Sequence, residues 1–235
     1  MNTANTDLPG GKISHRPLRF YWVLDVSGSM AGQKIGELNH AIREALPDMK
    51  DSADDNPHAS VEIRAITFST GYRWMTPTPV PLADFKWTDV SVSGITDMGA
   101  AMKAMAAEIA VGNMPERGLP PVMVLVSDGQ PTDDFDTGLN ALMAEPWGKR
   151  ALRMAIAIGH DADLDVLRRF IGHPEIEPLT AGNPGDLVKF IKYASTAVLK
   201  SASSPASQPV GTQLQGGPPP PPPPPPPADS DDDVW

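Results

Sequence analysis

The sequence predicts a doubly wound, Rossmann-like α/β domain, in which helices cover both faces of a mostly parallel sheet. Short apolar segments rich in β-branched and aromatic residues alternate with segments of helical periodicity along most of the chain. Three apolar segments, 18–24 (LRFYWVL), 122–126 (VMVLV) and 152–158 (LRMAIAI), have the composition of strands buried on both faces. Two of them end close to an aspartate, Asp25 or Asp128, at the edge where such sheets bind ligands.

Beyond the first strand, the first half of the chain is expected to form two helices and two further strands. Apolar residues recur at helical spacing from about 34 to 49 and again from 96 to 110, so each segment is expected to be a helix. The segment 61–68 (VEIRAITF) reads as a strand, and its alternating polar residues predict a more exposed position. A turn at 69–71 separates it from a short strand at 72–75, which is close enough to pair antiparallel with it.

The second half of the chain continues the alternation after a Pro-Pro break at 120–121. Beyond strands 122–126 and 152–158, a short strand is expected near 176–179, and helices are expected at about 135–144, 164–170 and 184–199. Strands that alternate with helices in this way are joined by right-handed crossovers into a parallel sheet.

Composition divides the chain into three parts. Residues 1–16 are polar and expected to be flexible, and residues 17–200 have the content of one folded domain. Residues 201–235 include ten consecutive prolines, and we expect them to be disordered, with the proline run as a polyproline II rod. This tail ends in an acidic, tryptophan-bearing segment, 231–235 (DDDVW), which predicts either a docking peptide for a second partner or a passive spacer.

The charge and composition exclude several classes of function. A net charge of −10 without a strong cluster of Lys and Arg argues against nucleic acid as a partner. The chain has no cysteine, so thiolate catalysis and cysteine-ligated zinc are excluded. No apolar run reaches the roughly 20 residues that span a bilayer, and the first residues lack the apolar core of a signal peptide. We therefore expect a cytoplasmic protein without a membrane partner.

The segment after the first strand carries the first candidate ligands. Asp25, Ser27 and Ser29 present one carboxylate and two hydroxyls on alternate residues, and Gly28 allows a tight turn between them. Such oxygen donors favour Mg²⁺, Mn²⁺ or Ca²⁺ over zinc or copper. On its own, however, an Asp-x-Ser segment after a strand is more often a turn or a helix cap.

Two further segments change this interpretation. Thr96 lies in GITDMG at a loop-to-helix junction, and Asp128 lies in VSDG directly after a buried strand. With these residues the sequence resembles the von Willebrand factor A family, whose metal-ion-dependent adhesion site is written Asp-x-Ser-x-Ser, then Thr, then Asp. The matching residues are Asp25, Ser27, Ser29, Thr96 and Asp128. The stretches VLDVSGSM, GITDMGAAM and VSDGQPTDD are similar to the bacterial tellurium-resistance TerY type of cytoplasmic A domain.

The resemblance implies a binding module rather than an enzyme. The three hydroxyls would approach a divalent cation, Mg²⁺ or Mn²⁺ before Ca²⁺, and the two aspartates would contact it or hold its water ligands. The cation would keep one open position for an exposed Asp or Glu of a partner protein, within a bacterial stress-response or signalling complex. Ile95 stands where many relatives have a second glycine, and we expect a stiffer loop with the ligand retained.

Two alternatives stay open at this point. One is a scaffold whose Pro-rich, acidic tail recruits partners while the A domain is inert. The other is a metal-dependent hydrolase or phosphatase with Ser27 or Ser29 as nucleophile, although none of the five histidines lies in the three motif loops. Among neighbouring acidic residues, Asp97 is expected either to cap a helix or to support the ligands, and Asp133 and Asp134 are expected to be helix-start carboxylates.

Overall fold

The computed structural model describes residues 15–56, 59–128, 130–159 and 162–203. Seven strands form one sheet in the order β3-β2-β1-β5-β6-β7, with β4 paired to β2. The strands are β1 (Arg16–Asp25), β2 (Ala59–Ser69), β3 (Gly71–Trp74), β4 (Val80–Pro81), β5 (Val122–Ser127), β6 (Leu152–Ile158) and β7 (Leu179–Ala181). The helices are α1 (Gln33–Asp54), α2 (Met98–Glu108), α3 (Phe135–Ala144), α4 (Pro146–Arg150), α5 (Leu164–Ile171) and α6 (Pro184–Ser203). Three short 3₁₀ turns are η1 (Gly28–Met30), η2 (Leu82–Asp84) and η3 (Val111–Asn113).

β1 is the central strand of the sheet. It pairs parallel with β2 on one side and with β5 on the other, so that Phe20 lies opposite both Ile63 and Val122. β5, β6 and β7 continue the parallel pairing, whereas β3 and β4 are antiparallel to β2. The predicted mostly parallel sheet is therefore confirmed, as is the antiparallel pairing of the short strand that follows β2.

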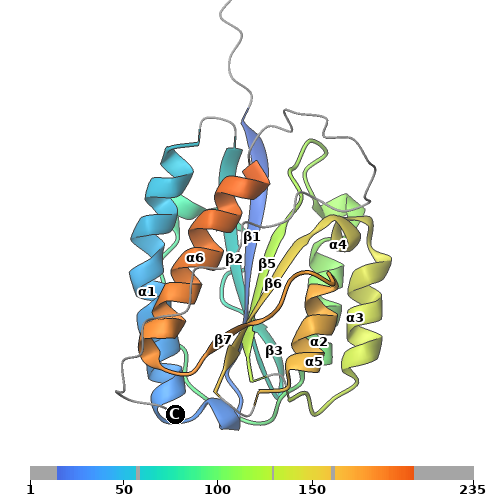
Figure 1. The fold of residues 1–235 in the computed structure, drawn as a ribbon. Helices are drawn as coiled ribbons and strands as arrows, with labels where there is room; N and C mark the ends of the chain where they lie inside the picture. Colours follow the sequence, from blue (N-terminus) through green and yellow to red (C-terminus); the bar gives the residue numbers. More distant parts are fainter. Residues whose placement is uncertain (1–14, 57–58, 129, 160–161, 204–235) are drawn as a thin grey trace, which may run out of the picture.

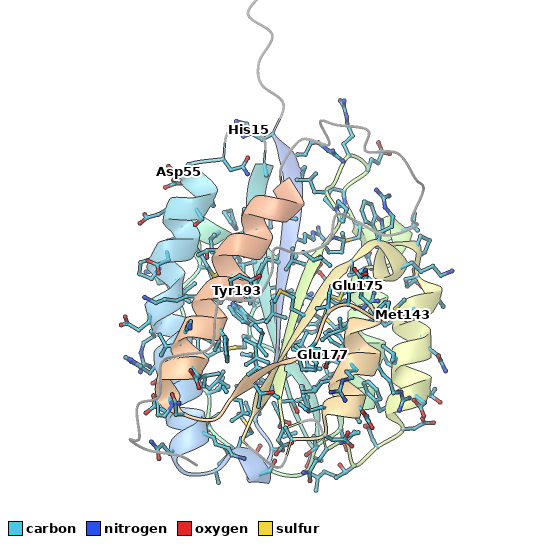
Figure 2. The ribbon with its side chains drawn as sticks, viewed as in Figure 1. His15, Asp55, Met143, Glu175, Glu177 and Tyr193 are labelled. Carbon is cyan, nitrogen blue, oxygen red and sulfur yellow. The ribbon has the colours of Figure 1, made fainter. Side chains whose placement is uncertain are left out.

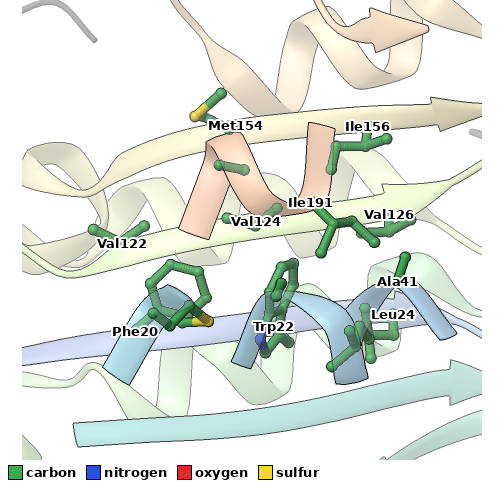
Figure 3. Close-up of a cluster of buried hydrophobic side chains, with 14 of the residues drawn as sticks. Phe20, Trp22, Leu24, Ala41, Val122, Val124, Val126, Met154, Ile156 and Ile191 are labelled. Carbon is green, nitrogen blue, oxygen red and sulfur yellow. The ribbon is translucent and has the colours of Figure 1, made fainter. Parts of the chain in front are cut away.

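Helices cover both faces of the sheet, as Figure 1 shows. Helices α1 and α6 lie on one face, and α2, α3, α4 and α5 lie on the other. The two faces of β1 divide between two apolar cores, because successive side chains of a strand point in opposite directions. Phe20, Trp22 and Leu24 pack with alternate residues of β5 and with Ile191 of α6 (Figure 3). Tyr21 and Val23 face the second core, under α2 and α5.

Three departures from the expected elements have physical causes. β2 is buried along most of its length, although it was expected to be more exposed. Its Arg64 can be buried because the guanidinium donates to the carboxylate of Glu108 in α2 and to the Thr76 carbonyl. The strand expected at 176–179 begins only at Leu179, since Ile176 is held in a turn by a bond from its N–H to the His173 carbonyl. Helix α4 was not expected; it is a single turn of five residues with proline at its first position.

Helix α1 extends past its predicted end, to Asp54. None of the helices in the described part of the chain combines the length and the apolar character that crossing a membrane requires. Of the segments expected to be flexible, 1–16 and 201–235, residues 1–14 and 204–235 lie outside the described residues. Arg16 instead begins β1, and α6 continues to Ser203.

Candidate metal centre

The predicted ligands lie at the edge of the sheet where the parallel strands end. β1 ends at Asp25 and β5 ends at Ser127, directly before Asp128, and these two strands are neighbours in register. The 3₁₀ turn η1 follows β1 and is the dark blue turn at the lower edge of Figure 1. Figure 2 labels His15 and Asp55 at the opposite end of the domain, where β1 begins and α1 ends.

Asp25 is fully buried, and its carboxylate is held by two donors. Its Oδ1 accepts from the backbone N–H of Ser27 at 2.8 Å, and its Oδ2 accepts from the hydroxyl of Ser127 at 2.6 Å. Burial raises the pKa of Asp25, and the charge of Asp128 raises it further, while the bonds from Ser127 and Ser27 oppose that rise. The two carboxylates therefore carry like charges at the ends of neighbouring strands.

Among the predicted ligands, Asp128 has a buried oxygen without a hydrogen-bond partner in the described part of the chain. Its side chain is buried, with 1% of the residue exposed, and its Oδ2 has no hydrogen-bond partner among the described residues. Among the described residues, the backbone N–H of Gln130 donates a long bond of 3.4 Å to its Oδ1. A buried carboxylate oxygen without a partner is costly, because the water that solvated it in the unfolded chain has not been replaced. A cation bound at this point would remove that cost.

The two serine hydroxyls lie together in the turn that follows β1. Ser27 Oγ and Ser29 Oγ are 2.9 Å apart, Ser27 is buried and Ser29 is exposed. The turn η1 holds them there, since the Met30 N–H donates to the Ser27 carbonyl. One residue of the pair therefore lies in the interior and the other at the surface.

Backbone contacts join the three loops that carry the predicted ligands. The Gly28 N–H donates to the Gly94 carbonyl at 3.1 Å, and a Cβ at Gly28 would lie 3.3 Å from that oxygen, so the loops approach closely there. On the other side, Thr96 and Thr132 exchange two bonds: the Thr132 N–H donates to the Thr96 carbonyl at 2.8 Å, and Thr96 N–H donates to Thr132 Oγ1 at 3.0 Å. The loop after β5 is thereby fixed to the loop before α2.

The donor set fits a hard divalent cation. Two carboxylates and three hydroxyls supply only oxygen, which Mg²⁺ and Mn²⁺ accept and which soft metals disfavour. Within the described ranges, no group of three or more His, Asp or Glu side chains is placed to hold a metal, so a histidine-rich or carboxylate-rich site of that kind is not formed there. A cation bound to this donor set would explain why Oδ2 of Asp128 is buried without a hydrogen-bond partner among the described residues.

Two neighbouring acidic residues, Asp97 and Asp133, do not cap the helix that follows each of them in the chain. Asp97 occupies the N-cap position of α2, yet its Oδ2 accepts from the Gly71 N–H at 2.7 Å, in the turn between β2 and β3. Asp133 accepts instead from the N–H groups of Gly99 and Ala100 at 2.8 Å each, and so caps α2 from the loop before α3. Sequence reasoning missed this contact, because nothing local relates residues 34 positions apart.

Asp134 does cap its own helix, as expected. It accepts from the Thr137 N–H at 2.9 Å at the start of α3. The described histidines, His15, His40 and His173, form no hydrogen bond to Ser27 or Ser29; the ring of His173 accepts from Glu175 N–H in a surface turn. Within the described chain, neither serine has the imidazole base of a hydrolytic triad.

No family model matches the sequence, and no curated protein matches it either. Solved structures do resemble the fold. A von Willebrand factor type A protein from Catenulispora acidiphila is 14% identical with a TM-score of 0.58, over 78% of this chain and 43% of that one. The pilus adhesin SpaC from Lactobacillus rhamnosus GG is 13% identical with a TM-score of 0.62, over 80% and 30% of the two chains.

A third structure, the ArnB paralog VWA2 from Sulfolobus acidocaldarius, is 16% identical with a TM-score of 0.54, over 77% of this chain and 45% of that one. The chain thus spans less than half the length of each of these three proteins. At such identities the likeness concerns the fold alone. The chain has the Rossmann-like fold of von Willebrand factor A domains.

Proposed function

We propose that this chain is a metal-dependent binding module of the von Willebrand factor A family. One divalent cation, Mg²⁺ or Mn²⁺, is held by Ser27, Ser29 and Thr96 together with Asp25 and Asp128. The observation that carries the proposal is the buried Oδ2 of Asp128, which has no partner in the described chain and lies beside a second buried carboxylate. A bound cation would satisfy the first group and relieve the repulsion with the second.

The cation's chemistry determines the class of partner. Neutral hydroxyls supply three of the five ligands, so the ion retains much of its positive charge toward solvent. The exposed side of the site, at Ser29, would accept an Asp or Glu carboxylate from a partner protein. From the resemblance to TerY-type A domains we infer that the partner belongs to a cytoplasmic stress-response or signalling complex. On this proposal the chain binds and does not catalyse.

The test is to capture binding proteins from a lysate of the native host on the immobilised full-length chain. The capture is done once with Mg²⁺ and once with EDTA. The variants are wild type, Asp25→Ala and the control Asp51→Ala, which removes an exposed carboxylate from α1. We expect at least one protein to be retained by wild type and by the control only when metal is present, and to be lost from Asp25→Ala. Partners that are indifferent both to EDTA and to Asp25→Ala would overturn the proposal. If those partners also disappeared on removal of residues 204–235, the scaffold alternative would be supported instead.

A further inference from the structure

A surface groove lies beside the candidate metal centre, on the part of the sheet formed by β2 and β3. It consists of two hollows of about 330 Å³ and about 180 Å³ that share Arg73, and we call the pair the Arg73 groove. Hydroxyl groups dominate the lining of the larger hollow, which includes Thr67, Ser69, Thr70, Tyr72, Ser91 and Ser93. Lys86 lines the smaller one.

The larger hollow adjoins the predicted ligands directly. Val26, which lies between Asp25 and Ser27, is part of its wall, and the Val26 carbonyl accepts from the Ser93 N–H at 2.8 Å. Ser69 Oγ and Ser93 Oγ are 3.2 Å apart across the hollow's rim. A chain segment bound at the metal centre could therefore continue into the groove without leaving the protein surface.

The charge of the groove is opposite to that of the protein. The chain carries 29 Asp and Glu against 19 Lys and Arg, yet no acidic side chain lines either hollow. Arg73 and Lys86 are both exposed, and neither forms an ion pair with any described residue. By contrast, Arg64 on the neighbouring strand is buried and paired with Glu108. The Arg73 groove thus presents two uncompensated cations to solvent.

This lining favours an extended acidic peptide over other ligands. The larger hollow offers few apolar walls to an apolar small molecule, whereas Trp74, Met75 and Phe85 line the smaller hollow beside Lys86. Hydroxyls can donate to and accept from a peptide backbone, and a guanidinium can bind a carboxylate through two parallel bonds. Both features suit one strand of polypeptide with spaced carboxylates.

We propose that the Arg73 groove is a second contact site for the partner, and that it binds a further carboxylate of the same acidic segment whose first carboxylate reaches the metal. This inference rests on the proposed function, because it takes the metal centre as the first contact. It makes the recognised ligand a segment with two acidic residues a few positions apart, rather than a lone Asp or Glu.

The experiment measures the affinity of labelled synthetic peptides for the full-length chain by fluorescence anisotropy. One peptide carries a single Asp in a Gly/Ser background, and a series carries a second Asp at increasing distance from the first. The protein variants are wild type, Arg73→Gln, Lys86→Gln and the control Lys149→Gln, an exposed lysine on α4. For the best spacing we expect the second Asp to tighten binding to wild type and to the control by about fivefold. We expect most of that gain to be lost in Arg73→Gln.

The outcomes separate this inference from the proposed function. A second Asp that brings no gain, a gain that persists in Arg73→Gln, or no binding of any peptide would overturn the groove proposal. Arg73-dependent binding that is unaffected by EDTA would support the groove and contradict the metal-bridged function. Replacing Asp231, Asp232 and Asp233 by Asn in the full chain provides a further control. If this change strengthened peptide binding only when Arg73 is intact, the occupant would be the chain's own tail and the partner assignment would be wrong.

Discussion

The hydroxyl of Ser127 donates a 2.6 Å hydrogen bond to Oδ2 of Asp25, so the last residue of β5 holds the carboxylate that ends β1. Both residues are fully buried, and their strands are parallel neighbours. The bond orients one predicted ligand from the residue that precedes another, Asp128. A hydrogen bond from a residue that is not itself a ligand commonly fixes the orientation of a metal ligand.

Replacing Ser127 by Ala should therefore weaken metal binding without abolishing it. We expect the affinity for Mg²⁺ or Mn²⁺ to fall by about tenfold, because Asp25 would lose the bond to its Oδ2 and keep the one from the Ser27 N–H to its Oδ1. Calorimetric titration of metal into wild type and Ser127→Ala measures the effect. An unchanged affinity would show that the Ser127 bond does not position Asp25 for the metal.

Asp128→Ala should change stability in opposite directions with and without metal. In EDTA the variant should be more stable than wild type by about 1–2 kcal/mol, because a buried carboxylate oxygen without a partner is removed. With saturating Mg²⁺, wild type should gain stability by mass action and the variant should gain none. Urea unfolding in both buffers tests this. Equal stabilisation of both proteins by Mg²⁺ would contradict the role given to Asp128.

Asp133→Ala should destabilise the protein more than its position in a surface loop indicates. The side chain caps two N–H groups of α2 and so ties α2 to the loop before α3. Loss of such a cap costs about 1–2 kcal/mol. Asp51→Ala, which removes an exposed carboxylate of α1, serves as the comparison in urea unfolding. If Asp133→Ala were neutral, the inter-loop cap would have no energetic importance.

Gly138→Ala should also be destabilising, although alanine is the better helix former. A Cβ at Gly138 in α3 would collide with the backbone of Gly99 in α2, so the two helices would have to separate. We expect a loss of about 2 kcal/mol or more, in the range for overpacked sites. Gly36→Ala in α1 is the matched control: its Cβ would meet nothing within 4 Å, and it should gain up to about 1 kcal/mol. Thermal unfolding that ranks the two variants in the reverse order would refute the close α2–α3 approach.

The sequence predicts most of the fold because its strongest signals are local. The helix at Phe135–Ala144 and the strand at Leu152–Ile158 have the predicted bounds, since a proline and charged residues flank regular apolar patterns. The 176–179 strand was misplaced because pairing with β6, rather than composition, decides where β7 begins. The burial of β2 was missed for a related reason: Glu108, the partner of Arg64, is 44 residues away.

In the candidate site, too, local patterns predict some features and long-range contacts decide the others. That Asp25 and Asp128 lie at the same edge of the sheet follows from two adjacent parallel strands, and the sequence indicated both strands. The bonds from Ser127 to Asp25 and from Asp133 to α2 depend on side-chain geometry that no local pattern encodes. The Arg73 groove could not be predicted either, because it combines residues of β2, β3 and the 85–93 segment.

The most direct test of the central claim is a calorimetric titration of Mg²⁺ or Mn²⁺ into the metal-free full-length chain. Wild type and the control Asp51→Ala should each bind one equivalent of metal, and Asp25→Ala should bind none under the same conditions. Circular dichroism of all three proteins establishes that they are folded. An absence of metal binding by wild type, or equal binding by Asp25→Ala, would contradict the metal centre.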